Sequence, residues 1–189
     1  MTTPTDRTFT LRRLHDPTGA EVAALAGVLV DCVDGGASVS FMHPFAHDRA
    51  LAFWRHIAQD VRAGKRALIV AEDDAGICGT VQLVLDVPEN QPHRAELVKM
   101  LVHRRARRQG LGAGLMRAAE STALACGRTL LVLDTVTDSA GERLYTRLGW
   151  QRLGVVPRYA LMPDGAFCDA TFFYKELGAA GARHVDAAP

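Results

Sequence analysis

A loop that turns into a helix carries the residues best suited to chemistry. Four arginines crowd into five positions, 104–108, and three glycines follow them: Gly110, Gly112 and Gly114. Glycine lets the backbone approach a ligand closely, and the first N–H groups of a helix have no partner within it. Together with the helix dipole they form an anion site suited to a pyrophosphate. Arg107 and Arg108 add positive charge at the same place.

Other glycine-rich motifs fit this junction less well. A Rossmann fingerprint needs GxGxxG directly after a strand, whereas the spacing here is GxGxG after a basic loop. A Walker loop ends in Gly-Lys-Ser/Thr, but this one continues Ala-Gly-Leu (113–115). On the loop alone, a structural glycine turn with solvated arginines remains the alternative.

The apolar periodicity predicts the elements that position this loop. Helices are expected near residues 20–33, 48–63, 111–126 and 139–148. Strands are expected near 8–14, 66–72, 77–86, 95–102, 130–134, 151–156 and 170–175. The order β-α-α-β-β-β-α-β-α-β-β indicates a mixed sheet with helices on both faces, in the α/β or α+β class. The continuous apolar run LLVLD (130–134) predicts a strand buried on both faces.

Composition limits the remaining function classes. A length of 189 residues fits one domain, expected over 1–177, with a small polar and disordered tail at 178–189. The net charge of +1 gives no reason to expect a nucleic-acid partner. Without an 18-residue apolar run or a signal peptide, no membrane association is expected. The four cysteines have no metal-ligand spacing, so free thiols in the cytoplasm and no metal are expected.

Two stretches resemble the signatures of the GNAT superfamily of N-acetyltransferases. RRQGLG (107–112) resembles its (Gln/Arg)-x-x-Gly-x-(Gly/Ala) motif and follows a strand ending in MLV (100–102), as in that family. SAGERLYTRLGW (139–150) resembles the second signature, a short helix with Leu-Tyr that ends in Leu-Gly-aromatic. The resemblance covers roughly Ile69 to Leu177. The phrases LDT (133–135) and PRYALMPDG (157–165), with the strand at 171–175, are similar to the tabtoxin-resistance acetyltransferase branch.

The resemblance implies a mostly antiparallel sheet of six to seven strands, flanked by about four helices and splayed between the strands 95–102 and 130–134. It implies that acetyl-CoA lies in this gap, with its pantetheine arm along the first strand and its pyrophosphate on the loop. The cofactor-binding residues would then be Met100, Leu101, Val102, Arg107, Arg108, Gln109, Gly110, Leu111, Gly112, Ala113 and Asp138. Asp138 stands where many relatives have asparagine. It can cap a helix and accept hydrogen bonds, but it cannot donate.

Attack of an amine on a thioester needs a neutral amine, a polarised carbonyl and a proton for the departing thiolate. Tyr145 matches the family's tyrosine that protonates the CoA sulfur, and a core tyrosine is the alternative. Glu96 matches the glutamate that acts as base in the histone-acetylating branch, and a solvated strand carboxylate is the alternative. Asp134 is expected to hold the substrate ammonium or relay a proton, with a helix-cap or loop role as the alternative.

The acceptor is expected between the first two helices, the apolar loop 37–47 and the C-terminal strands. Its candidate walls are Phe41, Met42, Tyr159 and Phe173, all of which also suit core or lid packing. The sequence thus predicts an acetyl-CoA-dependent N-acetyltransferase that acts on a small-molecule amine, such as a toxin or antibiotic, by direct attack in a ternary complex. A protein or peptide acceptor and a non-catalytic acyl-CoA-binding module are the alternatives. Many relatives form homodimers, and the sequence leaves the oligomeric state open.

Overall fold

The computed structural model describes residues 8–178. Its strands are β1 (Thr10–Leu14), β2 (Arg66–Asp73), β3 (Gly76–Val84), β4 (Arg94–Val102), β5 (Leu130–Val136), β6 (Gln151–Leu161) and β7 (Phe167–Glu176). Its helices are α1 (Gly19–Asp34), α2 (His47–Arg62), α3 (Leu111–Ala125) and α4 (Ala140–Arg147), with one 3-10 turn at Arg104–Ala106. The order is the predicted one, and the boundaries agree to within a few residues except in β6 and β7, which form a longer hairpin than expected.

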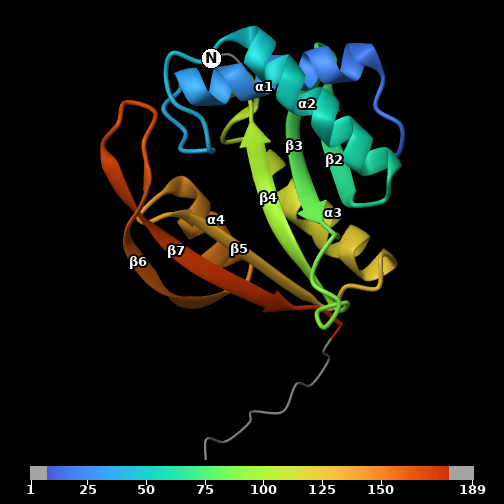
Figure 1. Cartoon of the computed structure of the whole chain (residues 1–189), viewed down its shortest axis with the longest axis vertical. Coiled ribbons are helices and arrows are strands. Elements are labelled where there is room, and N and C mark those ends of the chain that lie inside the picture. Colours follow the sequence, from blue (N-terminus) through green and yellow to red (C-terminus); the bar gives the residue numbers. More distant parts are fainter. Residues whose placement is uncertain (1–7, 179–189) are drawn as a thin grey trace, which may run out of the picture.

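All seven strands belong to one sheet in the order β1-β2-β3-β4-β5-β7-β6 (Figure 1). Neighbouring strands are antiparallel except for β4 and β5, which are parallel. This arrangement confirms the expected mixed, mostly antiparallel sheet. Because the single parallel pair lies in the middle of the sheet, it joins two antiparallel halves.

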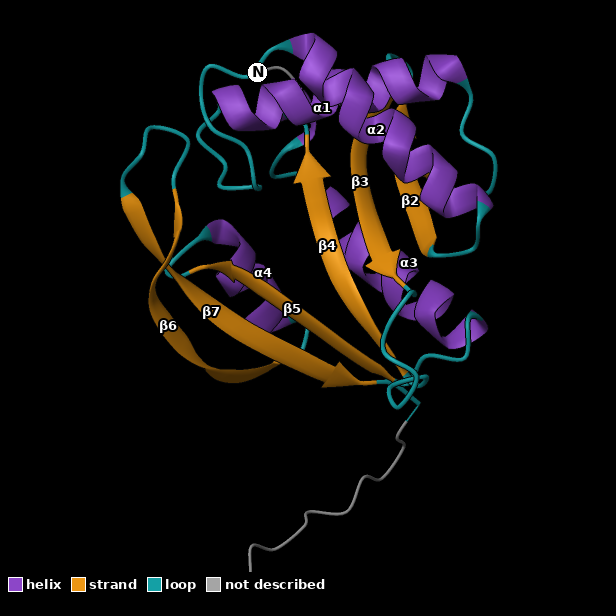
Figure 2. Ribbon diagram, viewed as in Figure 1, coloured by secondary structure: helices purple, strands orange, loops and turns teal. Residues whose placement is uncertain are grey.

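Helices cover both faces of the first half of the sheet, as predicted (Figure 2). Helices α1 and α2 lie on one face, where Leu68 and Val70 of β2 join their core. Helix α3 packs on the other face, where Ile69 of β2 faces the second core together with Tyr145 of α4. The alternation along β2 follows from the two-residue period of a strand.

The prediction that residues 130–134 are buried on both faces is wrong. Only Leu131 and Leu133 are buried, and they pack in the core with α3. Val132 is half-buried and Asp134 is exposed. On the other face of β5 neither Val132 nor Asp134 is buried among residues 8–178, and β4 separates from β5 beyond Val132.

The segment between α1 and α2 is a loop, as expected, and aromatic contacts hold part of it to α2. The ring of Phe41 lies 4.4 Å from that of Phe45 and 5.2 Å from that of Phe53 on α2. These contacts fasten the loop to α2 and give its apolar residues a structural role. Of the tail expected at 178–189, all but Gly178 lies outside the described residues.

Candidate active site

The central feature of the site is the separation of β4 from β5. Only three pairs join these strands, and the last of them pairs Glu96 with Val132. Beyond Glu96 the two strands diverge, so one edge of β4 has no neighbour among the described strands (Figure 2). The side chain of Leu101 is buried with α1 and α2, while those of Met100 and Val102 pack against the α3 core. Their side chains are therefore used in packing, and the backbone edge faces the divergence.

The carbonyl of Val102 is not free at this edge. It accepts a hydrogen bond from Nε of Arg107 at 3.0 Å, and Sγ of Cys32 lies 3.6 Å from it. Arg107 therefore holds the end of β4 to the start of the basic loop. The sequence had suggested a phosphate contact for this side chain, and its position in the structure gives it a local structural partner instead.

The loop before α3 presents an array of backbone donors. Gly110 is the N-cap residue of α3 and has a left-handed backbone (φ 79°), and no side chain caps this helix. Among residues 8–178, the N–H groups of residues 108–113 donate to no recorded acceptor. Unpaired N–H groups at a helix start attract an anion. The loop thus has the unpaired N–H groups that an anion site requires.

The four arginines of the basic stretch differ in their surroundings. Arg104 bonds Asp31, and Arg105 bonds Asp73 and two carbonyls of the β2–β3 turn region. Arg108 is exposed and has a left-handed backbone (φ 59°), and no interaction of its side chain is recorded within the described residues. Arg108 is therefore the arginine best placed to reach a bound anion.

Asp31 of α1 anchors the loop, a role that sequence reasoning missed. Its carboxylate is 9% exposed and accepts hydrogen bonds at 2.8 Å from both the backbone N–H and the Nε of Arg104. Burial acts to raise the pKa of Asp31, but these hydrogen bonds outweigh it and hold the pKa below its ordinary value. The carboxylate of α1 thereby fixes where the basic loop begins. In the sequence Asp31 is only a polar residue near the end of a helix.

Tyr145 of α4 is buried at the divergence. Its ring lies 6.0 Å from Phe173 and 6.1 Å from Trp150, and 5% of the residue is exposed. Burial, reinforced by the negative charge of Asp134, raises the pKa of Tyr145 well above its ordinary value. Its hydroxyl has no recorded hydrogen-bond partner in the described part of the chain. The phenol therefore keeps its proton at neutral pH and has it free to donate.

The two carboxylates suggested from the sequence lie on opposite strands of the divergence. Glu96 is half-buried at the last paired position of β4, and Asp134 is two residues beyond its partner Val132 on β5. Asp134 is exposed as a residue, but neighbouring groups partly desolvate its carboxyl and raise its pKa, although the positive charge of Lys99 opposes this. A carboxylate with a raised pKa is a better proton acceptor than an ordinary aspartate.

Lys99, which sequence reasoning did not select, joins this group. It lies on β4 with a left-handed backbone (φ 51°), where the pairing with β3 is irregular. In a regular strand Glu96 and Lys99, three positions apart, would face opposite sides of the sheet. The irregularity leaves Lys99 within electrostatic reach of both Glu96 and Asp134. The odd spacing of two charges in an apolar strand was the only sequence signal.

Asp138 and the start of α4 differ slightly from expectation. Ser139, and not Asp138, is the N-cap of α4, and its hydroxyl accepts from the N–H of Glu142 at 3.1 Å. Asp138 is exposed with a left-handed backbone (φ 60°), and its own N–H donates to the carboxylate of Glu142. The side chain of Asp138 is thus left at the surface beside the start of α4.

The expected acceptor walls divide into two groups. Phe41 is half-buried, Met42 is 39% exposed and Tyr159 is 51% exposed. Phe173 is 1% exposed and packs in the core behind Tyr145, so its selection as a wall needs correction. Its neighbour Phe172 lies opposite Asp134 in the strand register and contacts the ring of Tyr159 at 5.2 Å. Adjacent strand residues face opposite sides, so Phe172 takes the position we had expected for Phe173.

Three further observations concern the rest of the described chain. A surface hollow of about 460 Å³ lies between α1 and α2 and includes Arg55, but none of the candidate residues lines it. Within residues 8–178, no three His, Cys, Asp or Glu side chains gather as a metal ion would require. No described helix combines the length and apolar character needed to cross a membrane.

Comparisons with known proteins agree with this geometry. Residues 64–152, which include the diverging strands, the basic loop and Tyr145, match the family model described as acetyltransferase (GNAT) domain. The chain therefore carries a GNAT acetyltransferase domain, and acetyltransferase is the class of enzyme that its fold and site define.

Solved structures share the fold across nearly the whole chain. The putative acetyltransferase yncA from Salmonella typhimurium, solved with its cofactor acetyl-CoA, is 20% identical with a TM-score of 0.74 over 94% of this chain and 99% of that one. Ribosomal-protein-alanine N-acetyltransferase from Brucella melitensis is 20% identical with a TM-score of 0.74, over 89% and 99%. A putative phosphinothricin N-acetyltransferase is 19% identical with a TM-score of 0.72, over 91% and 100%. At these identities the likeness concerns the fold.

Proposed function

We propose that the protein transfers the acetyl group of acetyl-CoA to a primary amine of a small molecule, by direct attack within a ternary complex. The observation that carries this proposal is the position of Tyr145 within electrostatic reach of Asp134, where β4 has lost its neighbouring strand. A proton donor and a proton acceptor thus lie together beside an open backbone edge. A solved neighbour that holds acetyl-CoA supports the choice of donor.

The donor fits the residues present. The pyrophosphate would accept hydrogen bonds from the free N–H groups of residues 108–113, with Arg108 supplying charge. The pantetheine arm would lie along the open edge of β4 beyond Glu96 and complete it as a further strand would. A side chain at Gly112 would come within 3.1 Å of Leu144 Cδ2, so glycine allows α3 to lie close to the helix that carries Tyr145.

The residues of the chain supply the proton transfers. Asp134, with its raised pKa, would accept the proton of the acceptor ammonium and so free the lone pair for attack. Glu96, at the last paired position, would serve the same step through a water molecule if Asp134 only binds the ammonium. Tyr145 would donate its proton to the sulfur as the thioester bond breaks. These roles are proposals for each residue. The burial of Tyr145 at the divergence, with a hydroxyl that has no hydrogen-bond partner among residues 8–178, supports the last of them.

The α1–α2 loop favours a small acceptor over a polypeptide. On one side Ser40 accepts a hydrogen bond from Lys99 of β4 at 2.9 Å. On the other side the loop reaches the β6–β7 hairpin, where Ser38 donates to the carbonyl of Leu161 and the N–H of His43 donates to that of Pro163. Figure 1 shows this loop beside the tip of the hairpin. A loop fastened on both sides of the divergence leaves little room for an extended peptide.

An amine screen tests the proposal. Purified protein is incubated with acetyl-CoA and amines, amino acids, aminoglycosides and peptides in turn, while thiol release and the acetylated product are followed. Thiol release with small amines supports the proposal. Release with peptides alone would replace it with the peptide acceptor, and binding of acetyl-CoA without any release would favour an acyl-CoA-binding module. A toxin or antibiotic role would follow from the identity of the best amine.

We also infer a homodimer and a cytoplasmic location. The hairpin strands, among them the edge strand β6, expose large apolar side chains, of which Leu153 is 64% exposed and Phe167 60% exposed. Such exposed apolar residues favour a protein partner. Sedimentation of the wild type and of Leu153→Asp tests this, since a dimer through β6 should dissociate in the variant. The four free cysteines suit a reducing compartment.

A further inference from the structure

Lys99 is held in a specific position beside the proposed acceptor site. Its Nζ donates to Oγ of Ser40 at 2.9 Å and lies 6.0 Å from the ring centres of both Phe41 and Phe53. Both partners of this hydrogen bond have left-handed backbones, with φ 51° at Lys99 and φ 75° at Ser40. Such conformations are uncommon for residues with a side chain and persist where the surrounding structure holds them. The fold therefore fixes the lysine head group instead of leaving it to solvent.

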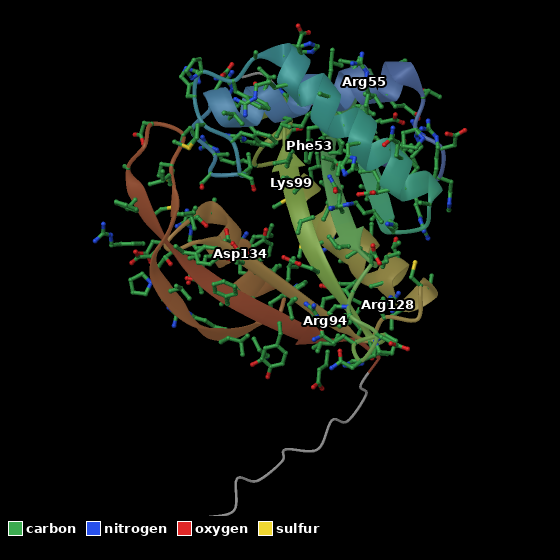
Figure 3. The ribbon with its side chains drawn as sticks, in the orientation of Figure 1. Phe53, Arg55, Arg94, Lys99, Arg128 and Asp134 are labelled. Atoms are coloured by element: carbon green, nitrogen blue, oxygen red, sulfur yellow. The ribbon has the colours of Figure 1, made fainter. Side chains whose placement is uncertain are left out.

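No ion pair within the described residues neutralises the positive charge of Lys99. Among residues 8–178 no carboxylate lies within ion-pair distance of its Nζ, and Ser40 is its only recorded hydrogen-bond acceptor. An ammonium group has three N–H donors, so two remain available. Asp134, on the opposite strand of the divergence, also lacks an ion-pair partner in the described chain and lies within electrostatic reach of Lys99 (Figure 3). A cation on β4 thus faces an anion on β5 across the space between the strands.

A small molecule that carries both charges matches this arrangement. Its ammonium would lie at Asp134, beside Tyr145, and its acidic group at Lys99 and Ser40. Phe41 and Phe53 on one side and Phe172 on the other would exclude water and strengthen both contacts. A simple monoamine would leave Lys99 without a counter-ion and would place a second positive charge near it. Burial and the positive charge of Arg66 lower the pKa of Lys99. A bound acidic group would raise this pKa again and stabilise the charged lysine.

We propose that the acceptor is an amino-acid-type compound, whose carboxylate or phosphinate binds Lys99 and Ser40 while its amine lies at Asp134. This inference rests on the proposed function and specifies its substrate class. It makes Lys99 a specificity-determining residue. It gives Asp134 and Lys99 complementary tasks, because one receives the reacting end of the acceptor and the other receives its acidic end.

The test compares matched acceptors. The proteinogenic L-amino acids and phosphinothricin are assayed with acetyl-CoA, and the best of them is then compared with its α-amide and its decarboxylated amine. We expect kcat/KM to fall by at least about 50-fold when the acidic group is removed, since a site built around a charged contact rejects analogues that lack it. If the wild type acetylates the amide or the amine as well as the acid, the inference is wrong and the proposed function still stands.

Variants of Lys99 distinguish a role in binding the acidic group from a role in packing. Lys99→Met keeps the length of the side chain without its charge, Lys99→Arg keeps the charge, and Lys65→Met removes an exposed surface charge as a control. Lys99→Met should lower kcat/KM for the acid by about 50-fold, leave the amide and amine within about threefold, and leave the KM for acetyl-CoA unchanged. Lys99→Arg should retain the preference for the acid, and Lys65→Met should match the wild type.

Two further outcomes would overturn the inference. An equal loss with all three acceptors in Lys99→Met would assign Lys99 a packing role. An unaltered preference for the acid in that variant would place the acid-binding group elsewhere. If Lys99→Met fails to fold, the comparison of acid, amide and amine in the wild type still decides the substrate class. If no compound in the panel releases thiol, the proposed function fails and the inference fails with it.

Discussion

Glu96 of β4 and Val132 of β5 form the last pair of residues that joins these two parallel strands. Just beyond this pair, Lys99 and Asp134 lie on separating strands, and Tyr145 lies within electrostatic reach of Asp134. The two charged groups proposed to bind the acceptor both lie on this short stretch of the two strands. Substitutions there should therefore affect chemistry more than folding.

Tyr145→Phe should lower kcat by about 100-fold, the usual worth of a well-placed general acid. The Kd for acetyl-CoA should stay unchanged, because the cofactor contacts proposed here come from β4 and the loop before α3. Thermal stability should change little, since no hydrogen bond of the hydroxyl is recorded within residues 8–178 and a buried hydroxyl without a partner contributes little. Tyr174→Phe, on β7, is the control and should match the wild type. Full activity in Tyr145→Phe would remove this residue from the mechanism.

Asp134→Asn should remove the acid limb of the pH–rate profile. In the wild type this limb should lie above the ordinary range for aspartate, because burial raises the pKa of Asp134. Activity should rise as pH increases through that pKa and the carboxyl loses its proton. In Asp134→Asn, kcat/KM should be about 100-fold lower and independent of pH in this range. A wild-type acid limb that persists in the variant would assign the base to another group, with Glu96→Gln the next substitution to measure.

Asp134→Asn should also raise the melting temperature at neutral pH. A carboxyl whose pKa is raised by folding stabilises the folded state below its unfolded pKa and loses that contribution as pH rises through the folded pKa. The ionised carboxylate is therefore unfavourable at pH 7, and the neutral amide avoids this cost. The gain should vanish in scans at low pH, where the wild-type carboxyl is protonated. A lower melting temperature of the variant at pH 7 would contradict the raised pKa of this carboxyl.

Asp31→Asn should weaken both the fold and cofactor binding. The carboxylate of Asp31 is buried and bonded twice to Arg104, so its loss should lower the free energy of unfolding by about 1–3 kcal/mol. The KM for acetyl-CoA should rise because Arg104 begins the basic loop. Since the pKa of Asp31 is lowered in the fold, its contribution is present at neutral pH and is lost as pH falls through that pKa.

Asp16→Asn provides the control for this experiment. Asp16 pairs with Arg62 at the surface and its side chain is 79% exposed, so the change should cost about 0.5 kcal/mol or less. If Asp31→Asn unfolds in urea at the same midpoint as Asp16→Asn and the KM for acetyl-CoA is unaltered, Asp31 does not anchor the loop.

Gly110→Ala should weaken acetyl-CoA binding specifically. Gly110 has φ 79° at the start of α3, and a side chain there favours a different backbone conformation that would turn the N–H groups away. Gly165→Ala is the matched control, because Gly165 also has a left-handed backbone (φ 94°) and open space around it but lies in the β6–β7 turn. Both should lose about 1 kcal/mol of stability. Calorimetric titration with CoA should show a raised Kd in Gly110→Ala alone, and equal affinities would contradict the role of the loop.

The elements and their order could be predicted because each depends on local periodicity and on turn residues. The α3 N-terminus is an example, since Gly110 and the apolar residues after it mark the start of the helix within the sequence itself. The separation of β4 from β5 was expected only through the family resemblance. No local pattern distinguishes a strand that is covered on both faces from one whose second face is open, as the error at residues 130–134 shows.

Site residues that depend on register or on distant contacts were harder to predict. Phe172 and Phe173 are adjacent residues of the same type, and only the pairing with β5 decides which of them faces the site. Lys99 reaches the site only because β4 is locally irregular and because a loop about 60 positions earlier in the chain contacts its head group. Neither feature can be read from the residues around Lys99. Arg107 and Arg108 are neighbours of one type, yet the first bonds Val102 and the second is exposed.

Acetyl transfer from acetyl-CoA to a small primary amine at the divergence of β4 and β5 can be measured directly. Thiol release and the mass of the product are followed for wild type and Tyr145→Phe with the same amine panel. We expect amine-dependent thiol release, a product heavier by one acetyl group, and a large loss of rate in Tyr145→Phe with acetyl-CoA affinity intact. Acetyl-CoA binding without acetylation of any small amine by the wild type would contradict it.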